Sequence, residues 1–211
     1  MKEDNTMQSE QIKNIAKKLI EAGYSGLFLS GRHNLADSIW RNGENRNYLE
    51  QIVQSSHYSD LARLWASEVL YTKASDYPLE EWDDILAYLY SQALAITGDK
   101  TANLQILGNQ WGFMYHTDKF GIKDYGPLGT HLVKTGPKAI PHLAKLLDDP
   151  GLIPYEGSRD ATLGNSLAYR VKDAAAYYIG QITGIPVKFY KQTPDRDAEI
   201  ERLKEALKNY K

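Results

Sequence analysis

The fold is decided by the stretch from Thr135 to Gly184, which opens with TGPKAIPHLAKLLDD (135–149) and closes with YRVKDAAAYYIGQITG (169–184). Each part carries apolar residues at helical spacing: Ile140, Leu143, Ala144, Leu146 and Leu147 in the first, and Val171, Ala174, Ala175, Tyr178, Ile179 and Ile182 in the second. Gly136 and Pro137 suit a helix start, and Gly184 suits a helix end. The stretch therefore predicts two antiparallel helices.

A long polar loop, from Pro150 to Ser166, is expected between these two helices. Long loops in compact domains are usually functional or disordered. The segment YEGSRDATLGNSLAYR (155–170) is therefore the first candidate for binding, through Tyr155, Glu156, Arg159, Asn165 and Arg170. The alternative is that these polar side chains pair with nearby backbone groups and only hold the loop in shape.

The two parts also resemble the repeats of the HEAT-like family. The first-helix pattern is matched by Gly136, Ala139, Ile140, Pro141, Leu143, Leu146, Leu147 and Asp149, and the second by Val171, Lys172, Ala175, Ala176, Ile179 and Gly180. The resemblance covers about a quarter of the chain. The inserted loop departs from the family, whose paired helices are normally joined by a tight turn. The segment ARLWASEVLY (62–71) echoes the second-helix pattern, which supports a repeat architecture.

This resemblance implies an all-α fold, a short right-handed α-solenoid of antiparallel helix pairs with one long inserted loop. Solenoids of this kind bind partners on a concave face that successive second helices form. In this chain the implied face draws on Arg63, Lys172 and Tyr177. The implied partner is a protein or a peptide.

Apolar periodicity predicts further helices along the chain, at Ser9–Ala22, Asn34–Arg41, Asn47–Gln54, Leu79–Thr97, Leu128–Thr135 and Asp195–Tyr210. Another is expected to begin at Ser59 or Asp60 and reach Ala74, and one more to begin at Thr101. Residues 117–126 have no helical pattern and are expected to form a loop. We expect a flexible leader at 1–8 and a single helical repeat domain at 9–211, in which 195–210 form a capping helix.

Composition narrows the function classes. Lys and Arg total 25 against 27 Asp and Glu, a net charge of −2, which argues against a nucleic-acid binder. The chain has no cysteine, which excludes disulfides, thiolate nucleophiles and cysteine metal sites.

No apolar run is long enough to span a membrane. The polar start is no signal peptide; a cytoplasmic protein is the default, and an exported lipoprotein whose signal and lipidated cysteine are missing from this sequence is the alternative.

No catalytic motif is present. The histidines do not form a zinc-binding H-E-x-x-H pair, and neither a serine nucleophile elbow nor a phosphate-binding loop occurs. No catalytic residue, metal or cofactor is therefore assigned. The chain holds 15 tyrosines and 4 tryptophans, and we expect Trp65, Trp82 and Trp111 to lie in the core rather than on a binding surface.

Three functions stay open at this stage. The first is a non-enzymatic interaction or scaffold module. The second is an enzyme of HEAT-like fold, such as a DNA alkylation-repair glycosylase, which would need Trp65, Arg63 and Asp173 at a basic centre. The third is a dedicated inhibitor or immunity-type protein. The resemblance and the absence of catalytic motifs favour the first.

Overall fold

The computed structural model describes residues 2–29, 31, 34–78, 80–97, 112–114, 116–118, 121–123, 126–155 and 159–210. The chain divides into two compact units, Met1–Ile85 (unit 1) and Leu86–Lys211 (unit 2). A single repeat domain over 9–211 with a flexible leader at 1–8 stays a prediction.

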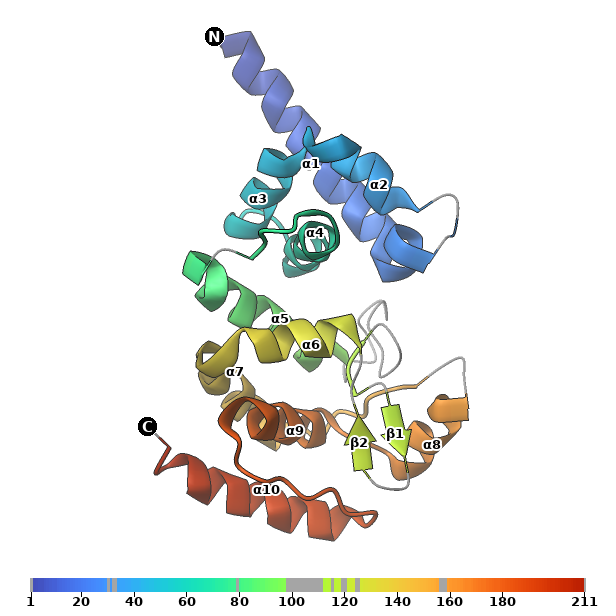
Figure 1. The fold of residues 1–211 in the computed structure, drawn as a ribbon, viewed down its shortest axis with the longest axis vertical. Coiled ribbons are helices and arrows are strands. Elements are labelled where there is room, and N and C mark those ends of the chain that lie inside the picture. Colours follow the sequence, from blue (N-terminus) through green and yellow to red (C-terminus); the bar gives the residue numbers. More distant parts are fainter. Residues whose placement is uncertain are drawn as a thin grey trace. The chain divides into compact units, whose positions relative to one another are not determined.

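The expected helical class is confirmed, since helices make up most of the described residues (Figure 1). One local expectation was wrong. Residues 117–126 were expected to form a loop, but the backbone there forms a short antiparallel hairpin. Strand β1 (His116–Asp118) pairs with β2 (Gly121–Lys123), with His116 opposite Lys123. Among the described helices, none is both long and apolar enough to cross a membrane.

Unit 1 is built from helices around a central one, α4. Its elements are α1 (Lys2–Tyr24), a π-helical turn (Ser25–Leu29), α2 (Leu35–Trp40), a 3-10 turn (Arg41–Gly43), α3 (Arg46–Gln54), α4 (Asp60–Lys73) and a 3-10 turn (Glu80–Trp82). Helix α5 (Asp83–Thr97) begins in this unit and continues into unit 2. Helices α1 and α3 both pack against α4. Helix α1 begins earlier than the predicted Ser9.

Helix α4 is central because it is apolar around most of its circumference. All residues from Ala62 to Leu70 are buried, and Trp65 is fully enclosed. The predicted cap is confirmed, since the Ser59 hydroxyl accepts a hydrogen bond from the backbone N–H of Ala62 at 3.3 Å. Trp82 is buried as predicted, whereas Trp111 and most of the helix expected from Thr101 lie outside the described residues.

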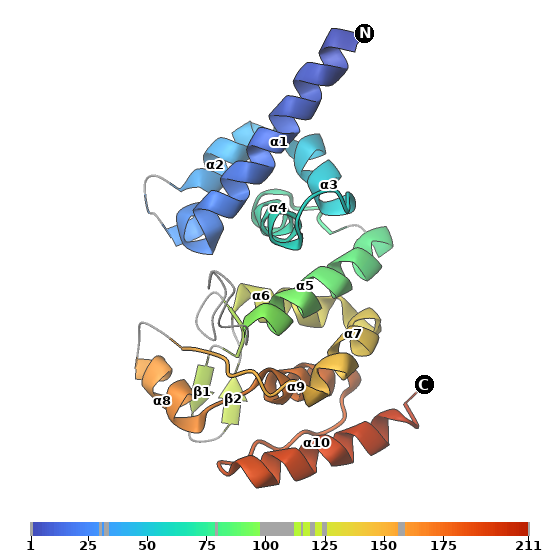
Figure 2. The same cartoon turned by 180° about the vertical axis from the view of Figure 1, so that it is seen from behind.

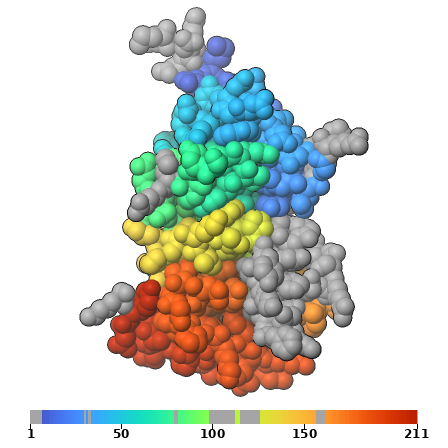
Figure 3. Space-filling model, in the orientation of Figure 1, coloured from blue at the N-terminus to red at the C-terminus, as the bar shows by residue number. Residues whose placement is uncertain are grey.

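Unit 2 is organised around α9 (Val171–Thr183). Its other elements are the β1–β2 hairpin, α6 (Pro127–Lys134), a 3-10 turn (Gly136–Ala139), α7 (Ile140–Lys145), a 3-10 turn (Leu146–Asp148), α8 (Arg159–Leu167) and α10 (Thr193–Leu207). Helices α6, α7 and α10 pack against α9, and Figure 2 shows this group from behind. Figure 3 shows the orange and red segments that include α9 and α10 side by side on the surface.

The pair predicted from 135–184 is present with two corrections. The first helix is broken into α7 and two flanking 3-10 turns, since Pro137 and Pro141 remove backbone donors from its first turns. The second helix ends at Gly184 in the left-handed conformation (φ 73°), as predicted. The expected loop at 150–166 contains a helix, α8, over Arg159–Leu167.

Helix α8 forms because it packs on Tyr155, a contact that no local pattern reveals. The Asn165 side-chain amide makes two hydrogen bonds with the Tyr155 backbone. Its oxygen accepts from the Tyr155 N–H at 3.1 Å, and its nitrogen donates to the Tyr155 carbonyl at 2.7 Å. The buried Tyr155 hydroxyl donates to the Met114 carbonyl at 3.2 Å. Gly164 lies so close to the Tyr155 ring that a Cβ there would be 2.5 Å from it. These contacts hold the inserted segment against unit 2.

We therefore expect Gly164→Ala to lower the free energy of unfolding by about 1–2 kcal/mol, since the clash with the Tyr155 ring outweighs the gain in helix propensity. Thr162→Ala is the matched control, because Thr162 is exposed on the same helix, and its stability should stay within about 0.5 kcal/mol of the parent. Urea unfolding measures both. A Gly164→Ala protein as stable as the control would contradict the packing of α8 on Tyr155.

Candidate functional site

Two of the charged residues predicted to bind a partner, Arg170 and Lys172, belong to an ion-pair network in unit 2. The network is centred on Asp173 and also includes Arg196 and Asp197 (the Asp173 network). The Asp173 side chain is completely buried at the first turn of α9. It accepts hydrogen bonds from the Arg170 backbone N–H at 2.9 Å and from the Arg170 side chain at 3.0 and 2.7 Å. The second arginine, Arg196, lies 3.4 Å from the same carboxylate.

Arg196 joins three segments of unit 2. Its guanidinium donates to the Leu167 carbonyl at 3.0 Å and to the Ala168 and Tyr190 carbonyls at 3.3 Å. It also lies over the Tyr169 ring, 5.2 Å from its centroid. Burial raises the pKa of the Tyr169 phenol to about 12, so that ring stays neutral beside the ions.

Asp197 closes the network at the surface. It pairs with Arg170 at 2.9 Å and with Lys172 at 2.8 Å, which ties α10 to the start of α9. The hydrogen bond from Lys172 is the main cause that holds the pKa of Asp197 below its ordinary value. The structure thus places the predicted residues Arg170 and Lys172 together, and both already contact carboxylates.

Other predicted residues have structural contacts of their own. Arg63, in unit 1, is buried; it donates to the Val53 carbonyl at 2.9 Å and pairs with Asp60 at 3.0 Å, which fastens α3 to α4. Tyr155 and Asn165 hold α8, as described above. Arg159 is the first residue of α8, and its side chain, like the whole of Glu156, lies outside the described part of the chain. A binding role for these residues stays a prediction.

Tyr177 is half-buried on α9 and is the predicted residue that lines a hollow. Its ring meets Tyr178 and Phe189 edge-on, with centroids 5.1 and 5.7 Å apart. The hollow encloses about 240 Å³ between α6 and α9, and its lining is Gly129, Thr130, Val133, Lys134, Tyr177, Tyr178 and Gln181. This surface is small and is bounded mainly by side chains that also pack the two helices.

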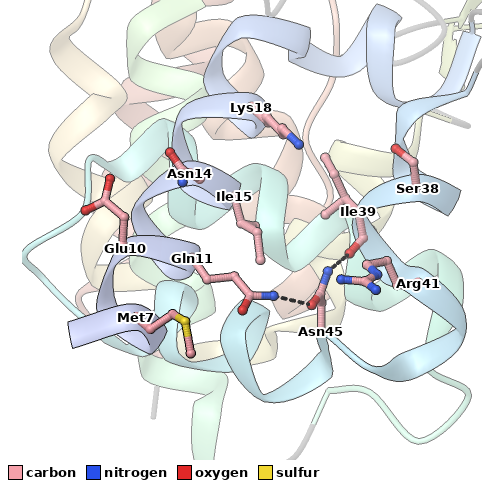
Figure 4. A pocket seen from close by; sticks show the side chains of 10 residues that line it. All are labelled: Met7, Glu10, Gln11, Asn14, Ile15, Lys18, Ser38, Ile39, Arg41 and Asn45. Carbon is pink, nitrogen blue, oxygen red and sulfur yellow. Dashed lines mark hydrogen bonds between the residues drawn. The ribbon is translucent and has the colours of Figure 1, made fainter. Parts of the chain in front are cut away.

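A larger hollow in unit 1 was missed by the sequence reasoning. It lies between α1 and the segment from α2 to Asn45, encloses about 460 Å³, and is here called the α1–α2 groove (Figure 4). Its lining residues are Met7, Glu10, Gln11, Asn14, Ile15, Lys18, Ser38, Ile39, Arg41 and Asn45. A second hollow, of about 480 Å³, lies on the other flank of α1, where α3 packs.

The α1–α2 groove combines an apolar floor with amide-bearing walls. Ile15 and Ile39 form the floor and are almost fully buried. Gln11 donates to the Asn45 side chain at 3.4 Å, and Asn45 in turn donates to the Ile39 carbonyl at 2.7 Å, so one chain of hydrogen bonds crosses the groove (Figure 4). Carboxamides offer a donor and an acceptor each, which matches the chemistry of a peptide backbone.

The rim of this groove holds unusual backbone. Arg41 and Asn42 have φ values of 49° and 52°, and Gly43 has 95°. Positive φ is strained for arginine and costs little for glycine. Such outliers persist where the surroundings fix them, and they gather at functional sites. The segment RNGENRN (41–47) is rich in turn formers, and this was the only local signal that could have pointed to the rim.

Among the described residues, no three His, Asp or Glu side chains are grouped so that they could hold a metal ion. Comparison with known protein families, curated proteins and solved structures finds no match for this chain.

Asp173→Asn tests the network. The change removes the carboxylate that faces the buried Arg196 and leaves Arg170 with Asp197 alone, so we expect the free energy of unfolding to fall by about 3–5 kcal/mol. Asp195→Asn is the control: it removes the same charge from an exposed position in the first turn of α10, and it should cost less than about 1 kcal/mol. Chemical unfolding of both proteins measures the difference. Equal losses of unfolding free energy in the two variants would show that the Asp173 carboxylate stabilises the fold no more than an exposed carboxylate does.

The lowered pKa of Asp197 predicts a pH dependence. Its ordinary pKa in the unfolded chain is about 3.9, so the folded protein holds the ionised form more strongly, and the resulting stability is present above that pH and lost as the pH falls through the lower folded value. Because the side chain is 42% exposed, we expect less than about 1 kcal/mol.

Asp197→Asn should therefore be less stable than the parent protein at pH 7, and the gap should close as the pH is lowered below about 4. Urea unfolding of both proteins at several pH values measures it. A gap that is the same at pH 7 and under acid conditions would rule out this contribution.

Proposed function

We propose that this protein is a non-enzymatic interaction module that binds a segment of a partner protein, and that the α1–α2 groove of unit 1 is its binding surface. The proposal includes the finer architecture suggested by the sequence, a short right-handed solenoid of HEAT-like antiparallel helix pairs. The packing of α3 on α4, of α7 on α9, and of α10 over α9 supports that architecture.

The groove itself is the observation that carries the proposal. Ile15 and Ile39 close its floor, and Met7, which is 70% exposed, offers apolar area that a partner can cover. It offers the exposed amide of Asn14 and the half-buried amide of Gln11, which can orient a polar backbone or side chain. Exposed Lys18 and Arg41 add charge at the edges, where charges set specificity and the rate of association rather than raw affinity.

The face implied by the family resemblance is less suited to this role. Arg63 and Arg170 are buried and paired, and Lys172 contacts Asp197. Moving any of them toward a partner would first break contacts that hold helices together, and breaking a buried ion pair is costly. In the groove, by contrast, Asn14 and Ser38 are exposed and can meet a partner without such a rearrangement, although Asn45 is buried and bonded to Gln11 and to the Ile39 carbonyl.

The glycosylase alternative gains no support from the described residues. Trp65 is fully buried in unit 1, and the Asp173 carboxylate of unit 2 is enclosed between two arginines. A flipped base would need both side chains to be accessible. The inhibitor or immunity-type reading is one form of the proposed function, in which the groove serves a single dedicated partner.

Site-specific photo-crosslinking in the organism of origin tests the proposal. A benzophenone amino acid at Ser38, which is exposed on the groove wall, should capture one stoichiometric protein. The same probe at Thr162, which is exposed on α8 in unit 2, should not capture it.

A second variant makes the result specific to the groove. Asn14→Trp fills the groove from its exposed wall, and we expect it to abolish capture at Ser38, since an interface tolerates truncation better than an added bulky ring at its centre. Circular dichroism confirms that the variant is folded. Capture that persists in Asn14→Trp, or capture of no protein in either case, would contradict a binding role for this groove.

A further inference from the structure

The side of α1 that borders the groove carries its charged residues in a regular order. The helix contributes six lining residues: Ile15 in the floor, and Met7, Glu10, Gln11, Asn14 and Lys18 in the wall. Their spacing of three or four residues keeps them on one side of the helix. Glu10 and Lys18, of opposite charge, lie at equal distances on either side of Asn14, about 12 Å apart along the axis. All three side chains are exposed.

A stripe with a negative charge, a central amide and a positive charge at equal spacing is complementary to itself when reversed. If a second copy of α1 lies antiparallel to the first, Glu10 faces the partner's Lys18 and Lys18 faces the partner's Glu10. Asn14 then meets the partner's Asn14, and two carboxamides can exchange hydrogen bonds. In a two-fold interface every such contact occurs twice.

We propose that the α1–α2 groove takes a second copy of this chain, through an antiparallel α1–α1 contact centred on Asn14. This inference rests on the proposed function, because it names the partner of the same groove. A single asparagine at the centre of a helix–helix contact fixes register and orientation at some cost in stability. The charged pairs at each end exclude the parallel arrangement, which would place like charges together.

Two further observations favour a helical occupant from another copy. The first turns of α1 extend beyond the helices that pack on the rest of it (Figures 1 and 2). Short helical stretches are marginal in water when nothing packs on them. Met7, on one of these turns, is 70% exposed, and its flexible thioether suits contact with another helix. A second copy of α1 would cover both.

The expected contact is weak and salt-sensitive. Its ion pairs are exposed, and such pairs contribute little each and are screened by salt. We expect sedimentation equilibrium of the full chain to show a monomer–dimer equilibrium at concentrations up to about 1 mM in low salt, shifted toward monomer at high salt.

Charge reversal tests the register. Glu10→Lys and Lys18→Glu each replace two attractive pairs with two repulsive ones, so each variant alone should dimerise about tenfold more weakly than the parent chain. Mixed in equal amounts, the two variants restore opposite charges at both ends and should form a mixed dimer. Lys13→Glu is the matched control, since it changes the net charge equally on an exposed position off the stripe, and its dimerisation should be unchanged.

The proposal is overturned if the parent chain is monomeric throughout, if Lys13→Glu weakens the dimer as much as Lys18→Glu does, or if the mixture associates no better than either variant alone. The binding groove and the self-association can be disproved independently of each other. A monomeric chain whose Ser38 probe still captures a different protein leaves the binding groove in place without self-association. A Ser38 probe that captures a second copy supports both.

Discussion

The enclosure of one carboxylate, that of Asp173, is the constraint on which unit 2 depends. Its side chain has no exposed surface, and it faces two guanidinium groups, from Arg170 and Arg196. Ions taken out of water are stable only when their partners and hydrogen bonds are complete. The start of α9, the carbonyls at 167–168 and the first turns of α10 must therefore be in place together. The helices of this unit are joined by ions as much as by apolar contact.

This constraint explains why the most chemically suggestive residues in the sequence are part of the fold. A charged side chain near the start of a helix can face a partner or a neighbouring helix, and the local pattern is the same in both cases. Arg63 shows the second outcome in unit 1, where it donates to the Val53 carbonyl at 2.9 Å and sits beside Asp60. Arg170 shows it in unit 2. Burial, which decides between the two, depends on residues distant in the chain.

Local signals were predicted well from the sequence, and non-local ones were not. The Ser59 cap and the helix end at Gly184 follow from residues that act within a few positions of the chain. Helix α8 depends on contacts between Tyr155 and Asn165 across ten positions of chain. The α1–α2 groove depends on a hydrogen bond between Gln11 and Asn45, which are separated by 34 positions. Periodicity carries no information about either contact.

The ions of the Asp173 network and those beside the α1–α2 groove differ in their exposure to water. In unit 2 the central ions of the Asp173 network are buried, and their interactions hold helices together. In unit 1 the ions that border the groove, Glu10 and Lys18, lie in water on one face of α1. Exposed charges contribute little to folding, so the fold does not account for their order around Asn14. Because electrostatic complementarity selects partners and orientation more than it adds affinity, the proposed α1–α1 contact would draw its register, rather than its strength, from that order.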